Sequence, residues 1–365
     1  FHRAMKERAA KLPYALSSTS THDTKRSEDV RVRIDALSEL TGLGRRTLQR
    51  LELLSRRFKR EVEGGPAPDR TDEWLFYQTL LGAWPLEFAE ADDLEVEPLG
   101  ALADRLTDYM LKAVREAKRR TSWSNPNLAY EEAVAAFVRG VLGEQRGSPF
   151  WTEFFRIAEP IARIGMLSGL SQVAIKLTAP GVPDLYAGTE LWDLSLVDPD
   201  NRRPVDWKRR AELLSDPLVN GAAGAESATA MLKRWRDGRV KLFVTRTLLR
   251  LRRARREMFL RGDYNALETT GERADHIVAY VSGVALVAVP RLLAGLLAER
   301  APFPLGRQIW GDSRLVLPRR RTSGTFRDAF TGRVHRVAVG DAPTLDAADV
   351  FADFPVAALV PEETE

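Results

Sequence analysis

The chain has 365 residues, of which 44% are hydrophobic and 29% are charged, close to the usage of average globular proteins. This length and composition predict roughly two or three folded domains and exclude disordered and fibrous proteins. The 55 basic and 51 acidic residues leave a small positive net charge, and the lack of cysteine excludes disulfides, thiolate nucleophiles and zinc sites built on sulfur. No run of about 18 apolar residues occurs, so no membrane-spanning segment is expected.

The first half of the chain combines one short strand with a long helical region. Residues 14–24 begin with small and β-branched residues and end in polar groups, which predicts a buried strand leading into a loop. Helices are expected over residues 25–165, where apolar residues recur at steps of three and four. The first such face is Leu48, Leu51, Leu54, Phe58 and Val62, with Gly64 to Pro66 ending its helix; the others are Leu102, Leu106, Met110, Ala113 and Ala117, and Tyr130, Val134, Phe137, Val138 and Val141.

The second half of the chain begins with a predicted strand at residues 173–177, followed by a polar, proline-containing loop. Residues 226–258 return to a helical pattern. After residue 262, short alternating segments separated by glycine or proline predict a small antiparallel β domain. Its strands are expected at residues 276–281, 285–289, 314–317, 326–330, 334–339 and 356–360.

Basic residues cluster at 56–60, 250–256 and 319–321. The first two clusters alternate with leucine and phenylalanine at helical spacing and have acidic neighbours. This pattern favours solvated, salt-bridged helix faces over a polyphosphate site. No nucleic-acid motif accompanies the clusters, so nucleic acid is not expected as a partner. The four histidines are far apart in sequence, which argues against a histidine-based metal site.

Three segments carry residues suited to chemistry. His22 and Asp23 follow the first predicted strand, where an imidazole and a carboxylate face a substrate if the strand belongs to a parallel barrel. The alternative is that Asp23 caps a helix that begins near Ser27. Residues 183–190 place an aromatic ring and a carboxylate in a tight loop suited to sugar recognition, or form a rigid connector. Residues 198–207 form either a binding loop or a salt-bridged surface turn.

A family resemblance rests on several of these segments. Residues 20–31, Ser-Thr-His-Asp-Thr-Lys-Arg-Ser-Glu-Asp-Val-Arg, resemble the characteristic segment of the maltooligosyltrehalose synthases of the α-amylase superfamily. Residues 77–85, 115–118, 121–123, 183–207 and 326–332 resemble further segments of that family, in the same order. The resemblance runs almost from end to end of the chain.

The resemblance implies an α/β fold, the last part of a (β/α)₈ TIM barrel with a C-terminal β domain. Residues 1–24 would hold barrel strand seven and its catalytic loop, and residues 25–165 a large helical insertion. Residues 166–260 would supply strand eight, the substrate loop and the last barrel helix. Residues 261–365 would form an antiparallel β-sandwich domain.

The family rearranges the reducing-end α-1,4 linkage of a maltooligosaccharide into an α,α-1,1 linkage, an intramolecular transglucosylation that serves trehalose synthesis. By resemblance, Asp23 is the carboxylate that stabilises the transition state, and the expected substrate-binding residues are His22, Lys25, Arg26, Tyr186, Glu190, Asp198, Asn201 and Arg202. No cofactor or metal is expected, and neither is a membrane partner.

The nucleophile and the acid/base of this chemistry belong to barrel strands four and five, which this chain does not contain. The chain is therefore interpreted as the C-terminal half of a cytoplasmic enzyme, from a truncated or cleaved chain or an incomplete gene. It is expected to need the missing N-terminal half as its partner and to be inactive alone. Two alternatives remain: a hydrolytic α-amylase relative acting on α-glucans, and a non-catalytic α-glucan-binding module.

Overall fold

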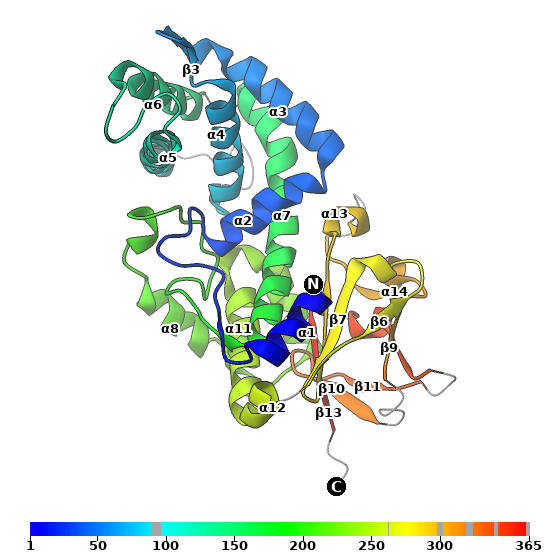
Figure 1. Ribbon diagram of the computed structural model, residues 1–365. Helices are drawn as coiled ribbons and strands as arrows, with labels where there is room; N and C mark the ends of the chain where they lie inside the picture. The colour runs from blue at the N-terminus through cyan, green and yellow to red at the C-terminus, as the bar shows by residue number, and fades with distance from the viewer. Residues whose placement is uncertain are drawn as a thin grey trace. The chain divides into compact units, whose positions relative to one another are not determined.

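The computed structural model describes residues 1–88, 96–145, 147–261, 263–297, 302–318, 324–338 and 342–362. The chain divides into two compact units. Unit 1 comprises Phe1–Thr21, Met166–Asp193 and Pro204–Glu365, and unit 2 comprises His22–Gly165 and Leu194–Arg203. Figure 1 shows the helices and strands of both units.

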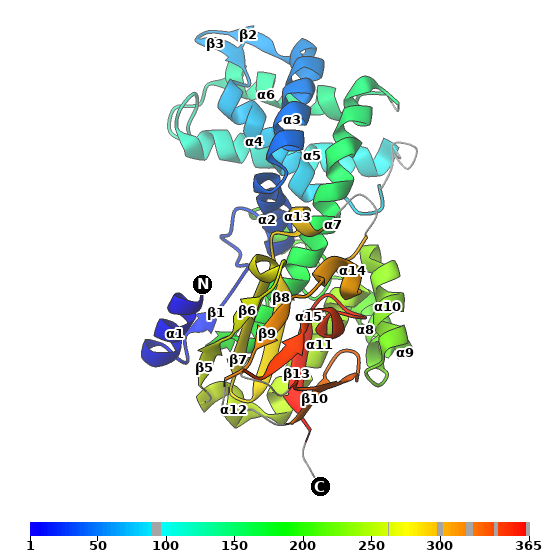
Figure 2. The same ribbon diagram turned by 90° about the vertical axis from the view of Figure 1, so that its right-hand side faces the viewer.

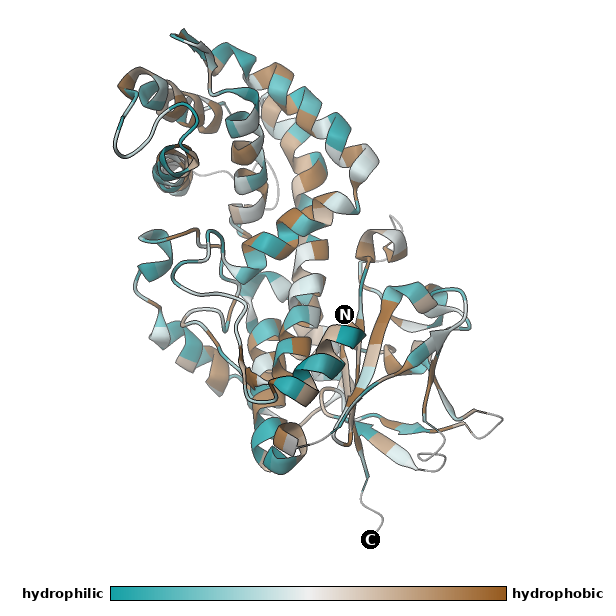
Figure 3. Ribbon diagram, in the orientation of Figure 1, coloured by the Kyte–Doolittle hydropathy of each residue, from teal (hydrophilic) through white to brown (hydrophobic). Residues whose placement is uncertain are grey.

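Unit 2 is a helical body, as the apolar periodicity predicts. Its helices are α2 (Glu28–Asp35), α3 (Thr41–Ser55), α4 (Arg70–Ala83), α5 (Val96–Ala117), α6 (Leu128–Leu142) and the first part of α7 (Pro149–Thr178). The predicted face on α6 is confirmed, since all five of its residues are buried. The face on α5 is confirmed for Leu102, Leu106 and Met110, whereas Ala113 is half-buried and Ala117 is exposed. Bands of hydrophobic and hydrophilic residues alternate along α3 in Figure 3.

Side chains fix where two of these helices begin. Asp69 caps α4 by accepting hydrogen bonds of 3.0 Å from the backbone N–H groups of Thr71 and Asp72. Asn127 caps α6 by accepting from the N–H of Tyr130 at 3.1 Å. Both residues have short polar side chains, which are preferred at this position because the first N–H groups of a helix lack partners inside it.

The prediction that one helical face continues to Val62 is wrong. Helix α3 ends at Ser55 and is followed by a 3₁₀ turn, η2 (Arg56–Phe58), and a hairpin of β2 (Arg60–Val62) with β3 (Gly65–Ala67). Gly64 and Gly65 form its turn at φ +92° and +113°, a backbone region that residues with a side chain rarely adopt. The two glycines therefore belong to a β-turn rather than to a helix end.

A short parallel pair of strands lies in unit 1, where β1 (Leu16–Ser17) pairs with β4 (Val182–Pro183). Gly181 lets the two strands approach, because a Cβ added there would lie 2.8 Å from the carbonyl oxygen of Ala15. The strand predicted at residues 173–177 is wrong, since these residues lie in α7. Leu170, Val173, Ala174 and Leu177 are all buried at helical spacing, and a short apolar run cannot by itself separate a buried strand from a buried helix.

The rest of unit 1 combines helices with two antiparallel sheets. The larger sheet has the order β11-β10-β13-β8-β7-β5 and the smaller one β12-β9-β6 (Figures 1 and 2). Their strands are β5 (Tyr264–Ala266), β6 (Glu268–Thr270), β7 (Ile277–Ser282), β8 (Ala285–Pro290), β9 (Arg314–Val316), β10 (Thr325–Asp328), β11 (Val334–Arg336), β12 (Thr344–Asp346) and β13 (Ala357–Pro361). The helices are α1 (His2–Lys11), α8 (Trp207–Ser215), α9 (Pro217–Asn220), α10 (Ala225–Lys233), α11 (Arg239–Ala254), α12 (Arg256–Arg261), α13 (Leu293–Leu296), α14 (Gly306–Trp310) and α15 (Ala347–Val350).

All six predicted strands of the β domain correspond to observed strands, with ends that shift by one or a few residues. β5, β6 and β12 are additional. Residue 339, at the end of one predicted strand, and the basic cluster 319–321 lie outside the described residues. β8 is buried at all six positions and pairs with β7 over its whole length, which explains why this hairpin has the clearest apolar signal in the sequence.

The two described basic clusters are used inside the fold. In unit 2, Arg57 forms an ion pair with Glu144, and the Nζ of Lys59 lies 2.7 Å from the carboxylate of the buried Glu73. In unit 1, Arg252 donates hydrogen bonds to the carbonyl oxygens of Leu177 at 3.1 Å and Gly181 at 2.6 Å. These contacts support the interpretation of both clusters as structural.

Candidate active site

The candidate site is built around the loop that carries His22 and Asp23. The Nε2 of His22 lies 3.3 Å from Oδ2 of Asp23, and both side chains are exposed, Asp23 by 81%. Helix α2 begins at Glu28 with Ser27 in the N-cap position. Asp23 therefore does not cap this helix, and the alternative that assigned it to that role is wrong.

A second loop, residues 194–203, pairs with the first. The side-chain Nδ2 of Asn201 donates to the carbonyl oxygen of His22 at 2.9 Å. Arg26 and Leu196 form an antiparallel bridge, and the N–H of Ser27 donates to the carbonyl oxygen of Ser195 at 3.0 Å. The backbone that presents His22 and Asp23 is thus held at its two ends by the second loop.

Helix α5 holds the second loop through two cationic side chains. Arg105 binds the carboxylate of Asp200 at 2.9 and 3.0 Å, in a bidentate geometry that fixes the orientation of the carboxylate as well as its distance. Lys112 donates to the carboxylate and the carbonyl oxygen of Asp198 at 2.9 and 2.8 Å. The hydrogen bond from Lys112 lowers the pKa of Asp198. Burial alone would raise the pKa of Asp200, but the bonds from Arg105 outweigh it and the pKa is lowered.

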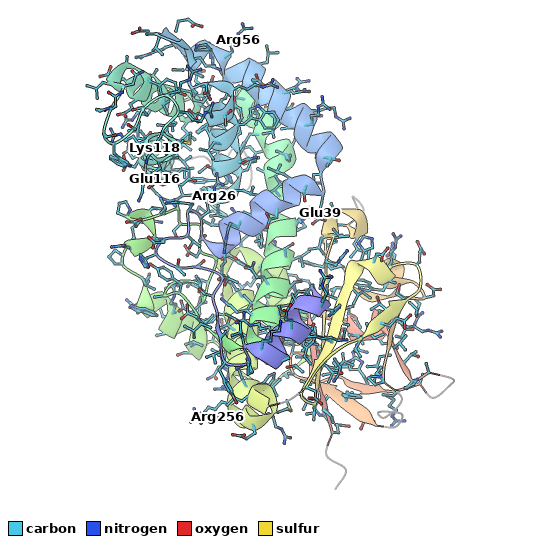
Figure 4. The ribbon with its side chains drawn as sticks, viewed as in Figure 1. Arg26, Glu39, Arg56, Glu116, Lys118 and Arg256 are labelled. Carbon is cyan, nitrogen blue, oxygen red and sulfur yellow. The ribbon has the colours of Figure 1, made fainter. Side chains whose placement is uncertain are left out.

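Lys25 and Arg26 have different surroundings. Lys25 is 60% exposed and its Nζ lies 3.0 Å from Oε2 of Glu116 at the end of α5 (Figure 4), a hydrogen bond that raises the pKa of Lys25. Arg26 donates to the hydroxyl of Thr79 at 2.9 Å, and its guanidinium lies 5.7 Å from the ring centroid of Tyr109. Lys25 is accessible to a ligand, whereas Arg26 packs within the helical unit.

The third element of the predicted site lies in unit 1. Glu190 accepts hydrogen bonds from the N–H of Gly188 at 3.1 Å and from Nε of Arg210 at 2.9 Å. The carbonyl oxygen of Tyr186 accepts from the N–H and the hydroxyl of Thr189. These bonds make the loop a braced connector. Tyr186 and Glu190 belong to unit 1, whereas the other predicted site residues belong to unit 2.

The structure brings six of the predicted residues into one polar cluster of unit 2: His22, Asp23, Lys25, Asp198, Asn201 and Arg202. Arg105 and Lys112, which hold the cluster, were not found from the sequence. They lie seven residues apart and so share a face of α5, but charged residues on the polar face of an amphipathic helix are ordinarily solvated, so their spacing does not reveal their partners.

Neither a metal site nor a membrane span emerges from the described parts of the chain. Among the described side chains, no three His, Asp or Glu groups converge as a bound metal ion requires. None of the described helices combines the length and hydropathy that a membrane crossing needs. A pocket of about 470 Å³ in unit 1 is lined by residues of α1, α12 and β5, and it contains none of the predicted site residues.

No family model matches the chain. A curated Mycobacterium tuberculosis protein named maltooligosyl trehalose synthase is 35% identical over 99% of this chain, which covers 39% of that protein. The structure of maltooligosyltrehalose synthase from Arthrobacter ramosus matches with a TM-score of 0.76 at 35% identity, over 99% of this chain and 40% of that one. A further maltooligosyl trehalose synthase crystal structure matches at 28% identity with a TM-score of 0.71, over 99% of this chain and 41% of that one. By sequence and by structure, the chain is similar to the maltooligosyltrehalose synthases and spans about two fifths of the length of the relatives that it matches.

Proposed function

We propose that the chain is the C-terminal part of a maltooligosyltrehalose synthase, acting on the reducing end of maltooligosaccharides. The observation that carries this proposal is the similarity over 99% of the chain to proteins of that name. The exposed His22–Asp23 pair in a loop held by Asn201 supports it, because a transition-state carboxylate must be both accessible and fixed.

The proposed barrel strands seven and eight are β1 and β4. Their parallel pairing supports this assignment, as does the position of the His22–Asp23 loop after β1 in the chain. In such barrels the catalytic side chains follow the C-terminal ends of the strands. The eighth strand then lies at Val182–Pro183, after α7, rather than at residues 173–177.

The proposed reaction exchanges one glycosidic bond for another. A carboxylate nucleophile attacks the anomeric carbon while a carboxylic acid protonates the leaving oxygen, which requires two groups about 5–5.5 Å apart. The released glucose then attacks the glycosyl-enzyme through its own anomeric hydroxyl, gives its proton to the acid/base residue and frees the nucleophile. The product is an isomer of the substrate, so the reaction needs no co-reactant.

In this proposal the remaining part of the enzyme supplies the nucleophile and the acid/base. Asp23 stabilises the positive charge that develops on the distorted sugar ring, where a fixed carboxylate acts mainly in the transition state. His22 binds a hydroxyl of the same sugar. Lys25, whose side chain is 60% exposed, holds the released glucose so that it turns and re-attacks instead of leaving.

The test compares the chain, the remaining N-terminal part of the enzyme and their mixture. Each is incubated with maltoheptaose, and non-reducing product and free glucose are both measured. The mixture should convert reducing into non-reducing sugar, and the chain alone should not. Activity of the unmixed chain would overturn the proposal that the remaining part of the enzyme supplies the nucleophile and the acid/base. A mixture that releases only glucose and shorter reducing chains would identify a hydrolase instead.

A further inference from the structure

Trp123 is a large apolar side chain that the fold leaves in solvent. It lies in the segment between α5 and α6, and 58% of its surface is exposed. The residues next to it in the chain are Ser122, Ser124 and Asn125, which carry hydroxyl and amide groups. A single exposed apolar side chain is common on protein surfaces, so the surroundings of Trp123 decide whether it marks a site.

One face of the Trp123 ring is already occupied. The guanidinium carbon of Arg115 lies 4.8 Å from the ring centroid, within the range of a cation–π contact. Arg115 is itself fixed, because its Nε and Nη2 donate to the two carboxylate oxygens of Glu131 at 2.9 and 2.5 Å. Since Arg115 covers one face and 58% of Trp123 is still exposed, the second face of the indole is the open one.

The backbone that carries Trp123 is braced by the same carboxylate. The hydroxyl of Thr121 donates to Glu131 at 2.6 Å and accepts from the N–H of Asn127 at 2.9 Å. Ser122 and Asn125 close the turn between them, with the N–H of Asn125 donating to the Ser122 hydroxyl at 2.9 Å. Glu131 is 5% exposed, so this bracing is an internal part of the fold.

We propose that Trp123 is a glucose-binding platform, which stacks one pyranose ring of an α-glucan on its open indole face. A pyranose offers an apolar face of C–H groups to the indole and a rim of hydroxyls to the neighbouring Ser122 and Ser124. A platform that is fixed before binding loses little entropy when the sugar arrives. The choice of an α-glucan rests on the proposed function.

The platform adjoins the candidate active site through consecutive residues of α5. Arg115 supports Trp123, and the next residue, Glu116, lies 3.0 Å from Lys25. A glucan chain that passes over Trp123 would therefore be guided towards the His22–Lys25 loop. A polypeptide is a less suitable occupant, because protein-binding surfaces gather several apolar side chains at their centre. Here Trp123 is the one aromatic residue of the segment between α5 and α6, and its immediate neighbours in the chain are serines. The apolar residues that follow it are Pro126 and Leu128, the latter 63% exposed.

The first test is oxidative footprinting of the unaltered chain. Hydroxyl radicals oxidise exposed tryptophan, and mass spectrometry reports the rate for the peptide that holds Trp123. Maltoheptaose should slow the oxidation of Trp123 severalfold, whereas the same mass of sucrose should not. Equal rates with the two sugars would overturn the proposal.

The second test measures maltoheptaose affinity by titration calorimetry for three variants. Trp123→Ala should raise Kd by about tenfold, in keeping with the loss of one aromatic stacking contact. Trp123→Phe keeps a flat ring and should stay within about threefold of the parent. Leu128→Ala is the matched control, an exposed apolar residue near the same loop, and should leave Kd unchanged.

The results separate this inference from the proposed function. An unchanged Kd in Trp123→Ala, or an equal loss in Leu128→Ala, would remove the platform. If the complete enzyme forms no α,α-1,1 linkage and Trp123 is still protected by maltoheptaose, the proposed reaction fails and the platform stands. If the linkage forms and Trp123 is not protected, the platform alone fails.

Discussion

The β7–β8 hairpin of unit 1 and helix α5 of unit 2 both bury apolar side chains, but they use their polar residues differently. β8 is buried at all six positions, and β7 adds two hydroxyls, those of Tyr280 and Ser282. α5 buries Leu102, Leu106 and Met110 on one side and uses Arg105, Lys112 and Glu116 on another to hold two loops. The hairpin keeps its unit folded, whereas α5 also arranges the candidate site. Substitutions in the hairpin should lower stability, and substitutions in α5 should lower activity as well as stability.

The largest expected effect concerns the site that α5 supports. Asp23→Asn in the complete enzyme should lower formation of non-reducing product by about 10²–10³-fold, since an electrostatic stabiliser of the transition state is lost. Because Asp23 is 81% exposed, the thermal midpoint should stay the same. The assay follows product formation alongside circular dichroism. Near-normal turnover would remove Asp23 from the mechanism.

The hairpin should respond in the opposite way. Leu286→Ala in β8 removes a fully buried side chain and should cost about 2–5 kcal/mol of unfolding free energy. Enzyme molecules that remain folded should keep their kcat, because none of the contacts described for β8 in unit 1 involves a proposed site residue. Urea unfolding and steady-state kinetics measure the two quantities. A lowered kcat at full folding would contradict the purely structural role.

The salt bridge between Arg105 and Asp200 should show both kinds of damage. Arg105→Met leaves the carboxylate of Asp200, 12% exposed, without its main partner. We expect a loss of about 2 kcal/mol in the stability of unit 2 and, in the complete enzyme, a severalfold fall in kcat as the 194–203 loop loosens. The double variant Arg105→Met with Asp200→Asn removes the unpaired charge and should recover much of the stability but not the kcat. Full recovery of both would show that the bridge does not position the loop.

A further prediction concerns how the stability of the β domain depends on pH. Asp328 in β10 is buried, and this burial raises its pKa to about 6. In the unfolded chain the pKa is about 3.9, so between about pH 4 and pH 6 the folded state holds a proton that the unfolded state has released. The stability that this group contributes therefore falls as pH rises through that window, by about 2 kcal/mol.

The variant Asp328→Asn cannot ionise and should lack this fall. Its urea midpoint, followed from pH 4 to pH 6.5, should change less with pH than that of the parent chain. The amide oxygen can still accept from the backbone N–H groups that surround Asp328, which keeps the comparison fair. Parallel curves for the two proteins would contradict the assigned burial effect.

The smallest expected effect concerns Lys25. Lys25→Ala in the complete enzyme should raise the ratio of free glucose to non-reducing product by about threefold, because one hydrogen bond to the released glucose is worth about 1 kcal/mol or less. The variant also leaves Glu116 without this ion pair, so Glu116→Gln serves as the control for the bridge alone. An unchanged ratio of free glucose to non-reducing product in Lys25→Ala would show that Lys25 does not hold the released glucose and is an ordinary surface lysine.

The same contrast explains what could be predicted from the sequence. The β7–β8 hairpin and helices α5 and α6 were predictable, because burial on one or both faces leaves a periodic apolar pattern in the chain itself. The β2–β3 hairpin was missed because Val62 in β2 follows Phe58 by four residues and so continues the apolar spacing of α3 beyond the end of the helix. Residues 173–177 were assigned to a strand because five apolar-leaning residues do not distinguish a strand from the end of a buried helix.

The candidate site was only partly predictable for a different reason. His22, Asp23 and Lys25 lie within four positions of one another, so a short segment of sequence contains them all. Arg105 and Lys112 act on Asp200 and Asp198, more than 80 positions further along the chain. No periodicity joins such partners, and only the fold brings them together.

Helix α5 also sets the spacing and the orientation of the three side chains that hold the candidate site. Arg105, Lys112 and Glu116 meet three separate partners from one rigid rod, and each residue of an α-helix turns the next by about 100°. A single inserted or deleted residue between Arg105 and Glu116 would swing one end of the row away from its partners while leaving the other in place. Within this stretch the rotational register of the helix holds the candidate site together, so substitutions in α5 should be tolerated far better than insertions or deletions.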